Sequence, residues 1–393
     1  MTGFTYVIDF CQYISNLNSM LIFDQVDPSK AQLHVLIIGV GVYPFLSGGT
    51  SQKNQIGALN QIGQLTSTVH SAEKFRETVL ALQATNSWAR PLGSVEMLVS
   101  ALPGTPQKYT APTRDNVEEA YNAWSDRCGS QKENIAIFYF AGHGFAKRQH
   151  HLLLEDFGEN TRLPCKGSFE FNDTRQAFSA NPAQTQLFFI DACRKVDRTL
   201  IDYEMTSSAL DTIKNNSVGC AYDLTIRAAT HNEATYGERN GLAHFTKALV
   251  LALTGQASVP IKGKWTVDMN SIATNINKIL DHIEVSKRSE KGCQVYMNRS
   301  TPLITLASAP EALLQVVCDP GAAHEIAELH CLTDEGEPFT YRQQPSPDPW
   351  MVKLPCGHYR LRADFKTPGY SHKAQPTLVL PPVTEENLSC SQP

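Results

Sequence analysis

The chain has 393 residues, of which 42% are hydrophobic and 19% charged, so it can bury large cores and is neither disordered nor fibrous. At about 150 residues per domain, this length favours two or three domains over one. The net charge of −5 comes from 34 basic and 39 acidic residues without long runs of one sign, which predicts neither a nucleic acid nor an anionic membrane as partner.

The first 30 residues are expected to form an N-terminal extension, residues 1–30, ahead of the main domain. Aromatic residues in this segment favour packing onto that domain over a free tail. The segment lacks the basic start of a secretory signal, because its first lysine is Lys30 and Asp9 interrupts its apolar part. We therefore expect a cytoplasmic protein.

Five short apolar runs, each apolar on both faces, follow between residues 31 and 300. Runs of this kind predict strands of a mostly parallel sheet that is covered on both sides. The longest mostly apolar stretch has 13 residues, fewer than the roughly 18 to 20 needed to span a membrane. The predicted strands are His34–Val40, Val95–Ser100, Ile135–Ala141, Gln186–Asp191 and Leu224–Thr230.

Segments with helical periodicity lie between these runs and predict crossover helices on the faces of the sheet. A further helix is marked by isoleucines from Ile272 to Ile283, with Asp268 or Asn270 available as N-cap. The buried faces of the first three helices are expected at Leu65, Val69, Ala72, Val79 and Leu82; at Val117, Ala120, Tyr121 and Trp124; and at Leu242, Phe245, Leu249 and Leu253.

Proline use changes sharply near residue 300. Only nine of the 22 prolines precede Pro302, and the remaining thirteen lie in the last 94 residues. Alternating polar and apolar residues in Glu328–Thr333 and Tyr359–Phe365 favour antiparallel strands, and Leu354–Leu361 resembles a strand-turn-strand of a β-sandwich. We expect an α/β domain over residues 31–300 and a small all-β domain over 312–393.

Ten cysteines are scattered along the chain without a C-x-x-C pair, a pattern typical of reduced thiols rather than of a disulfide framework. His150 and His151 are expected in a loop. Several His and Cys residues of the C-terminal region lack the paired spacing of a zinc site, so we predict no metal and no cofactor. They are His324, His330, Cys331, Cys356 and His358.

Two of the predicted strands end in residues that carry chemistry. The third ends in Ala-Gly-His143-Gly144, and the fourth in Asp191-Ala-Cys193-Arg. In an open parallel sheet, the carboxyl ends of the strands lie at one edge, where ligands bind. His143 and Cys193 are therefore expected to face one cleft, although fifty residues separate them.

A cysteine next to a histidine suits nucleophilic catalysis, because the imidazole can take the thiol proton and later protonate a departing amine. The amides of Gly144 and Cys193 could bind the oxyanion of the intermediate. The sequence offers no certain third side chain to orient His143. The alternatives without catalysis are a buried structural cysteine and a histidine in a turn whose ring bonds to a main-chain carbonyl.

At these residues the chain resembles the caspase-like cysteine peptidases, the clan that includes caspases, metacaspases and bacterial relatives. The resemblance covers roughly Leu33 to Thr254 and implies a caspase-like three-layer α/β sandwich and peptidase activity. The caspase signature is Gln-Ala-Cys-[Arg/Gln/Gly]-Gly with a histidine about fifty residues upstream, and here Asp191 and Lys195 replace its Gln and its last Gly. The motifs are LIIGVGVYP, IAIFYFAGHG, QLFFIDACR and AATHNEATYGERNGLAHFTKALVLAL.

An Asp two residues before the nucleophile, here Asp191, is similar to metacaspases, which cut after Arg or Lys. Glu233 and Glu238 lie roughly where basic-specific relatives carry acidic pocket residues, so the resemblance implies Arg or Lys at P1. Arg227 and nearby arginines complicate this expectation. Asp191 could instead cap neighbouring amides, and the two glutamates could be solvated loop charges. Peptidases with acidic or apolar P1 preference, and a catalytically silent scaffold, remain alternatives.

The resemblance also implies an inactive zymogen that is released by an upstream protease, by a regulator or by self-cleavage. Bacterial relatives with appended domains often act in stress or defence responses. We expect a protein substrate and a monomeric enzyme. Candidate cleavage positions in exposed connections are Arg162, Lys166, Arg175, Arg194, Lys195, Arg198 and Lys214.

Overall fold

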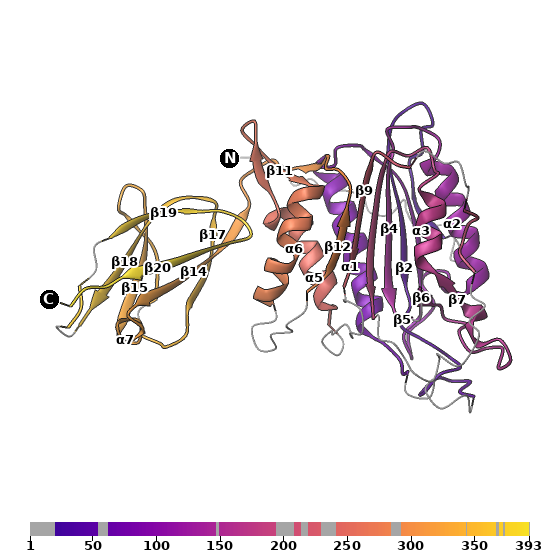
Figure 1. Ribbon diagram of the computed structural model, residues 1–393, viewed down its shortest axis with the longest axis horizontal. Helices are drawn as coiled ribbons and strands as arrows, with labels where there is room; N and C mark the ends of the chain where they lie inside the picture. Colours follow the sequence, from indigo (N-terminus) through magenta and orange to yellow (C-terminus); the bar gives the residue numbers. More distant parts are fainter. Residues whose placement is uncertain are drawn as a thin grey trace, which may run out of the picture. The chain divides into compact units, whose positions relative to one another are not determined.

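The computed structural model of the protein divides into two compact units (Figure 1). The first contains residues up to Val250 together with Ser286–Thr301, and the second contains Leu251–Val285 together with Pro302–Pro393. The structure describes residues 20–53, 62–146, 149–193, 208–213, 219–228, 241–283, 292–342, 344–366, 369–371 and 374–392.

A seven-stranded sheet forms the centre of the first unit, in the order β1-β3-β2-β4-β8-β9-β12. The five inner strands are parallel, and the edge strands β1 and β12 pair antiparallel with β3 and β9. Every residue of β2, β3, β4 and β8 is buried, as expected for strands covered on both faces. The strands are Leu21–Asp24 (β1), Leu33–Gly39 (β2), Leu92–Val99 (β3), Ile135–Gly142 (β4), Thr185–Ala192 (β8), Tyr222–Arg227 (β9) and Gln294–Met297 (β12).

Helices cover both faces of this sheet, as Figure 1 shows for α1 on one side and α2 with α3 on the other. Phe75 of α1 stacks on Tyr139 of β4 at 4.4 Å between ring centroids, whereas Phe178 of α3 packs against Phe188 of β8 on the opposite face. The predicted three-layer α/β sandwich is confirmed. The helices are Ser67–Ala84 (α1), Arg114–Cys128 (α2), Phe171–Phe178 (α3) and His244–Leu251 (α5), with α5 continuing into η4 at Ala252–Gln256.

A small antiparallel sheet, β5-β6-β7, follows the carboxyl end of β4. It contains His150 and His151, both buried, so their predicted loop position is wrong. Strands of three or four residues are too short for alternation to reveal them in a sequence. The strands are Gly144–Ala146 (β5), His150–Leu153 (β6) and Ser168–Glu170 (β7), with the short helix η3 at Pro164–Gly167 before β7.

The second unit contains the predicted isoleucine-rich helix α6, Met269–Ile283. Asp268 caps it: the main-chain N–H of Ser271 donates to the Asp268 carboxylate at 2.7 Å, and the Asp268 N–H donates to the Ser271 hydroxyl at 3.0 Å. A three-stranded sheet is built from two strands that precede this helix in the chain and one that follows it. Its strands are Val259–Ile261 (β10), Lys264–Asp268 (β11) and Pro302–Thr305 (β13).

The rest of the second unit is a β region of two sheets, β17-β14-β20 and β16-β15-β18-β19, which confirms the predicted all-β region. Their inner faces share one apolar core, which includes Leu314, Leu329 and Leu361. Leu354–Leu361 passes from β17 of one sheet to β18 of the other. The elements are Glu311–Asp319 (β14), Gly321–His324 (α7), Ala327–Thr333 (β15), Pro338–Arg342 (β16), Trp350–Pro355 (β17), Gly357–Phe365 (β18), Gln375–Val379 (β19) and Val383–Ser389 (β20).

Neither a membrane-spanning helix nor a metal cluster occurs in the described parts of the chain. None of their helices is long and apolar enough to cross a bilayer. No three His, Cys, Asp or Glu side chains gather there closely enough to hold an ion. His324, considered above as a metal ligand, bonds to the main chain: its Nδ1 accepts from the Cys318 N–H at 3.1 Å, and its Nε2 donates to the Asp348 carbonyl at 2.9 Å.

Candidate functional site

The ends of β4 and β8 place His143 and Cys193 side by side in the sheet. The two strands are parallel neighbours, and their register pairs Gly142 with Ala192 as the last position. His143 and Cys193 each follow that position directly, and neighbouring strands of a sheet lie about 4.8 Å apart. Both strands are buried on both faces, and their parallel pairing at this register brings His143 and Cys193 to one edge of the sheet.

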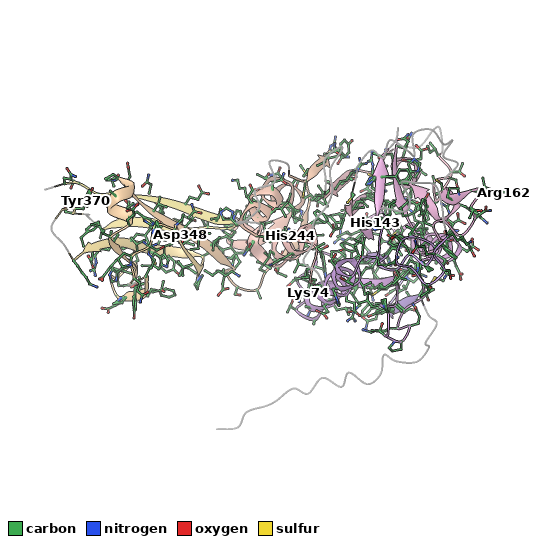
Figure 2. The ribbon with its side chains drawn as sticks, turned by 90° about the horizontal axis from the view of Figure 1, so that it is seen from below. Lys74, His143, Arg162, His244, Asp348 and Tyr370 are labelled. Carbon is green, nitrogen blue, oxygen red and sulfur yellow. The ribbon has the colours of Figure 1, made fainter. Side chains whose placement is uncertain are left out.

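Two groups hold His143, whose place in the fold is shown in Figure 2. Its ring Nε2 lies 2.8 Å from the main-chain carbonyl oxygen of Gly63, and its main-chain N–H donates to the hydroxyl of Tyr43 at 2.8 Å. A carbonyl can only accept, so Nε2 carries the hydrogen, and Nδ1 of the neutral ring is the proton acceptor. The orienting group is thus a main-chain carbonyl, which the sequence did not reveal because no side chain marks it.

Burial also sets the protonation of His143. Taking the ring out of water disfavours its charged form and lowers its pKa from 6.5 to about 4, although the bond to Gly63 opposes this shift. We therefore expect the ring to stay neutral from pH 8 down to about pH 5 and to become charged only near pH 4. NMR titration of the His143 ring carbon signals, assigned with a His143→Gln variant, checks this; a midpoint near 6.5 would contradict it.

Gly144, directly after His143, lies against the main chain of Cys193. A Cβ added at Gly144 would stand 2.7 Å from the Cys193 carbonyl oxygen, so only glycine allows this approach. The N–H of Leu153 donates to the His143 carbonyl, which makes Gly144 and Leu152 a pair without ladder hydrogen bonds. The Gly144 N–H therefore does not take part in the β5-β6 ladder.

His150 is a neighbour of Cys193 that the sequence interpretation missed. It lies in β6, is fully buried, and its Nε2 is 3.1 Å from the carbonyl oxygen of Cys193. Because that oxygen only accepts, Nε2 of His150 donates the hydrogen. His150 thus ties the main chain of Cys193 to the small sheet. The motif Gly-His-Gly drew attention to His143 alone, and nothing in the sequence distinguished His150 from a loop histidine.

Asp191, two residues before Cys193, is buried and faces the first turn of α5. Its carboxylate accepts from the Thr246 hydroxyl at 2.6 Å, and that hydroxyl also lies 2.6 Å from the hydroxyl of Tyr139. Burial raises the pKa of Asp191 to about 6, against the lowering effect of the Thr246 hydrogen bonds. In these contacts Asp191 links the end of β8 to the first turn of α5. Glu233 and Glu238 lie outside the described residues.

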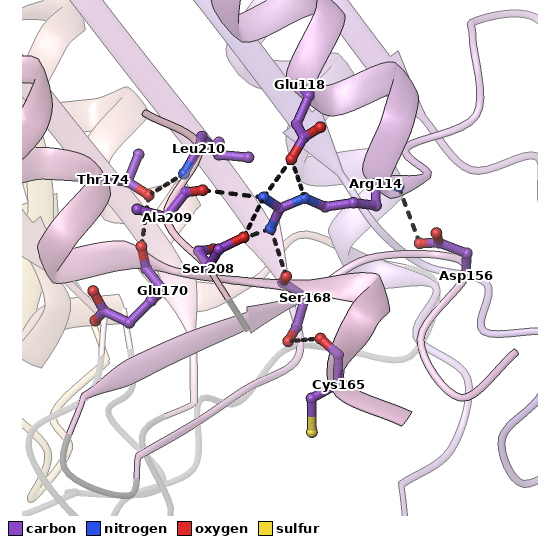
Figure 3. Close-up of polar contacts among 10 residues, drawn as sticks. All are labelled: Arg114, Glu118, Asp156, Cys165, Ser168, Glu170, Thr174, Ser208, Ala209 and Leu210. Atoms are coloured by element: carbon purple, nitrogen blue, oxygen red, sulfur yellow. Dashed lines mark hydrogen bonds and ion pairs between the residues drawn. The ribbon is translucent and has the colours of Figure 1, made fainter. Parts of the chain in front are cut away.

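Further along the connection after Cys193, residues 208–213 are described and anchored by Arg114 (Figure 3). The Arg114 guanidinium, almost fully buried, donates to the carbonyls of Ser208 and Ala209 at 3.1 and 3.0 Å and to that of Ser168 at 2.7 Å. Glu118 neutralises it from the same helix at 2.6 Å. Leu210 inserts into the core between α2, α3 and the sheet. This part of the connection is therefore fixed to the domain.

The predicted cleavage positions fall into different settings. Arg162 and Lys166 are exposed, and Figure 2 labels Arg162 at the margin of the first unit. Arg175 was expected in a loop, but it lies in α3 and pairs with Asp223 at 2.6 Å, so that expectation is wrong. The reason is that Glu170 caps a short helix here. The positions outside the described residues are Arg194, Lys195, Arg198 and Lys214.

Comparison with known proteins identifies the family. The family model of the caspase domain matches residues 32–306. An uncharacterized protein of Sinorhizobium fredii, y4kE, is 30% identical over 252 residues, which cover 61% of this chain and 73% of that protein. A crystal structure of protein GSU0716 from Geobacter sulfurreducens matches 68% of this chain and 93% of that chain with 15% identity and a TM-score of 0.40, too low to add to the argument. The chain belongs to the caspase-domain family of cysteine peptidases.

Proposed function

We propose that the protein is a cysteine endopeptidase in which Cys193 is the nucleophile and His143 the acid-base group. The observation that carries this proposal is the β4-β8 register, which sets both residues at adjacent strand ends. With Nε2 donating to Gly63, Nδ1 of His143 takes the proton of the Cys193 thiol as its sulfur attacks the scissile carbonyl carbon. The same nitrogen then gives the proton to the departing amine, and water hydrolyses the thioester.

The negative oxygen of the tetrahedral intermediate is bound, in this proposal, by the main-chain N–H groups of Gly144 and Cys193. Support comes from the close approach of these two segments and from the Gly144 N–H being outside the β5-β6 ladder. Fixed amides at this position stabilise developing charge without reorganising during the reaction.

The proposed substrate preference is Arg or Lys at P1. Asp191 is the acidic residue that supports it, because its buried carboxylate lies two positions before the nucleophile and is ionised above pH about 6. A carboxylate that a basic side chain could reach would bind it through charge-assisted hydrogen bonds. Glu233 and Glu238, which lie outside the described residues, are the further acidic candidates of this proposal. In the free enzyme, the hydrogen bond from the Thr246 hydroxyl orients the Asp191 carboxylate.

A panel of fluorogenic peptides that differ only at P1, with Arg, Lys, Asp or Leu, tests the proposal at pH 8, where Asp191 is ionised. We expect turnover of the Arg and Lys peptides by the wild-type chain and none by Cys193→Ala. Turnover restricted to the Asp or Leu peptide would leave the peptidase but reject the basic preference. No turnover of any peptide, even after limited proteolysis of the chain, would favour a catalytically silent scaffold.

A further inference from the structure

Two segments from different parts of the chain meet beside His143: the loop 41–49 after β2, and residues 62–66 before α1. The side chain of Gln64 joins them. Its Oε1 accepts from the Tyr43 N–H at 2.7 Å, and its Nε2 donates to the carbonyls of Tyr43 and Ser47, each at 3.0 Å. Gln64 therefore binds the Tyr43 main chain from both its donor and its acceptor, as a neighbouring strand would.

The two segments fit against each other without spare room. The Leu65 N–H donates to the carbonyl of Gly41 at 2.8 Å. A Cβ added at Gly41 would stand 2.4 Å from the Leu65 carbonyl oxygen, so the main chains are in direct contact. A change in how residues 62–66 are held will therefore displace main-chain atoms rather than be absorbed by loose side chains.

Each of the two segments contacts His143. The carbonyl of Gly63, the residue before Gln64, accepts a hydrogen bond from the imidazole Nε2. The hydroxyl of Tyr43, whose main chain is bonded to Gln64, accepts one from the His143 main-chain N–H. The Tyr43 ring also packs on the imidazole, with 4.9 Å between ring centroids. Tyr43 is fully buried, and burial raises the pKa of its hydroxyl, which stays protonated. Gln64 thus connects the two groups that fix the ring and the main chain of His143.

We propose that Gln64 is a positioning residue for His143: by fastening residues 62–66 to the Tyr43 main chain, it keeps the Gly63 carbonyl on the imidazole Nε2. This inference rests on the proposed function. The bond to Gly63 selects the tautomer with hydrogen on Nε2, which leaves Nδ1 able to accept a proton from the thiol. Without it, the ring is free to turn and to adopt the other tautomer, whose Nδ1 already carries a hydrogen.

The sharpest variant is Gln64→Glu, which keeps the shape and one acceptor oxygen but loses the donor to the Tyr43 and Ser47 carbonyls. We expect kcat on the peptide that the wild type cleaves best to fall by about 10²-fold, the scale expected for a misplacement of roughly 1 Å. KM should stay close to the wild-type value, because Gln64 does not contact substrate in the proposed mechanism. Gln64→Ala removes all three hydrogen bonds, including the one that Oε1 accepts from the Tyr43 N–H, without adding charge, and should act in the same direction.

Gln107→Glu is the matched control. The Gln107 amide also donates to two main-chain carbonyls, those of Val99 and Tyr109, in the loop after β3. Its hydrogen bonds among the described residues do not include His143 or Gly63. We expect kcat for this variant to remain at the wild-type level. An equal loss of kcat in both variants would overturn the inference, because it would show general loop damage rather than positioning.

A readout independent of peptidase activity is the tautomer of His143, measured from the nitrogen-15 shifts of the labelled imidazole. In the wild-type chain we expect hydrogen on Nε2 alone, and in Gln64→Glu a mixture of both tautomers. An unchanged tautomer together with unchanged kcat would overturn the inference. If the wild-type chain cleaves no peptide, the proposed function fails, and the tautomer measurement alone decides whether Gln64 positions the ring.

Discussion

Replacing His143 with glutamine will lower kcat/KM by about 10⁴-fold, the upper end of what general acid-base catalysis contributes. Glutamine keeps an N–H that can reach the Gly63 carbonyl, but its amide oxygen cannot take a proton from Cys193 near neutral pH. Combining His143→Gln with Cys193→Ala should cost no more than Cys193→Ala alone, because a nucleophile and its base act as a unit. Steady-state kinetics of the two single variants and the double variant measure both effects.

The matched control is His282→Gln. His282 lies in α6 of the second unit, where its Nδ1 bonds to the Lys278 carbonyl at 2.7 Å within the same helix. Activity should be unchanged in this variant. General acid-base catalysis contributes at least about 10²-fold. If His143→Gln therefore loses less than about 10²-fold in kcat/KM, His143 is not the base.

The sequence located the strand ends of the candidate site because their signals are local. His143 and Cys193 each follow a continuous apolar run, and such runs indicate buried parallel strands without any knowledge of their partners. In α5, Phe245 and Leu249 of the predicted apolar face are buried. The parallel pairing of β4 with β8 then brings both strand ends to one edge of the sheet, as expected for neighbours in an open parallel sheet.

The contacts that hold the site could not be predicted in the same way. Gly63 acts through its main-chain carbonyl, and Gln64 acts on the main chain of Tyr43, so neither has a side-chain pattern that indicates its role. His150 reaches Cys193 from a four-residue strand that is too short for periodicity to mark. Asp191 was identified by position, yet its bond to Thr246 depends on where α5 begins relative to β8, a tertiary feature.

Trp124→Ala is expected to have the largest effect on stability. Trp124 lies on the buried face of α2, which the spacing of the apolar residues predicted. Trp124 is fully buried and stacks on Phe178 of α3 with 4.4 Å between ring centroids, while its indole N–H donates to the His34 carbonyl of β2 at 3.2 Å. Removing the indole should lower the free energy of unfolding by about 3 to 5 kcal/mol through the cavity that remains.

Trp124→Phe separates the two contributions of this residue. It keeps an aromatic ring near Phe178 but removes the indole hydrogen bond to the His34 carbonyl, a loss of about 0.5 to 1.5 kcal/mol. Urea unfolding of wild type and both variants, followed by far-ultraviolet circular dichroism, gives the three free energies. A loss below about 1 kcal/mol for Trp124→Ala would mean that the site collapses around the missing ring, and that α2 and α3 do not depend on Trp124 to cover this face of the sheet.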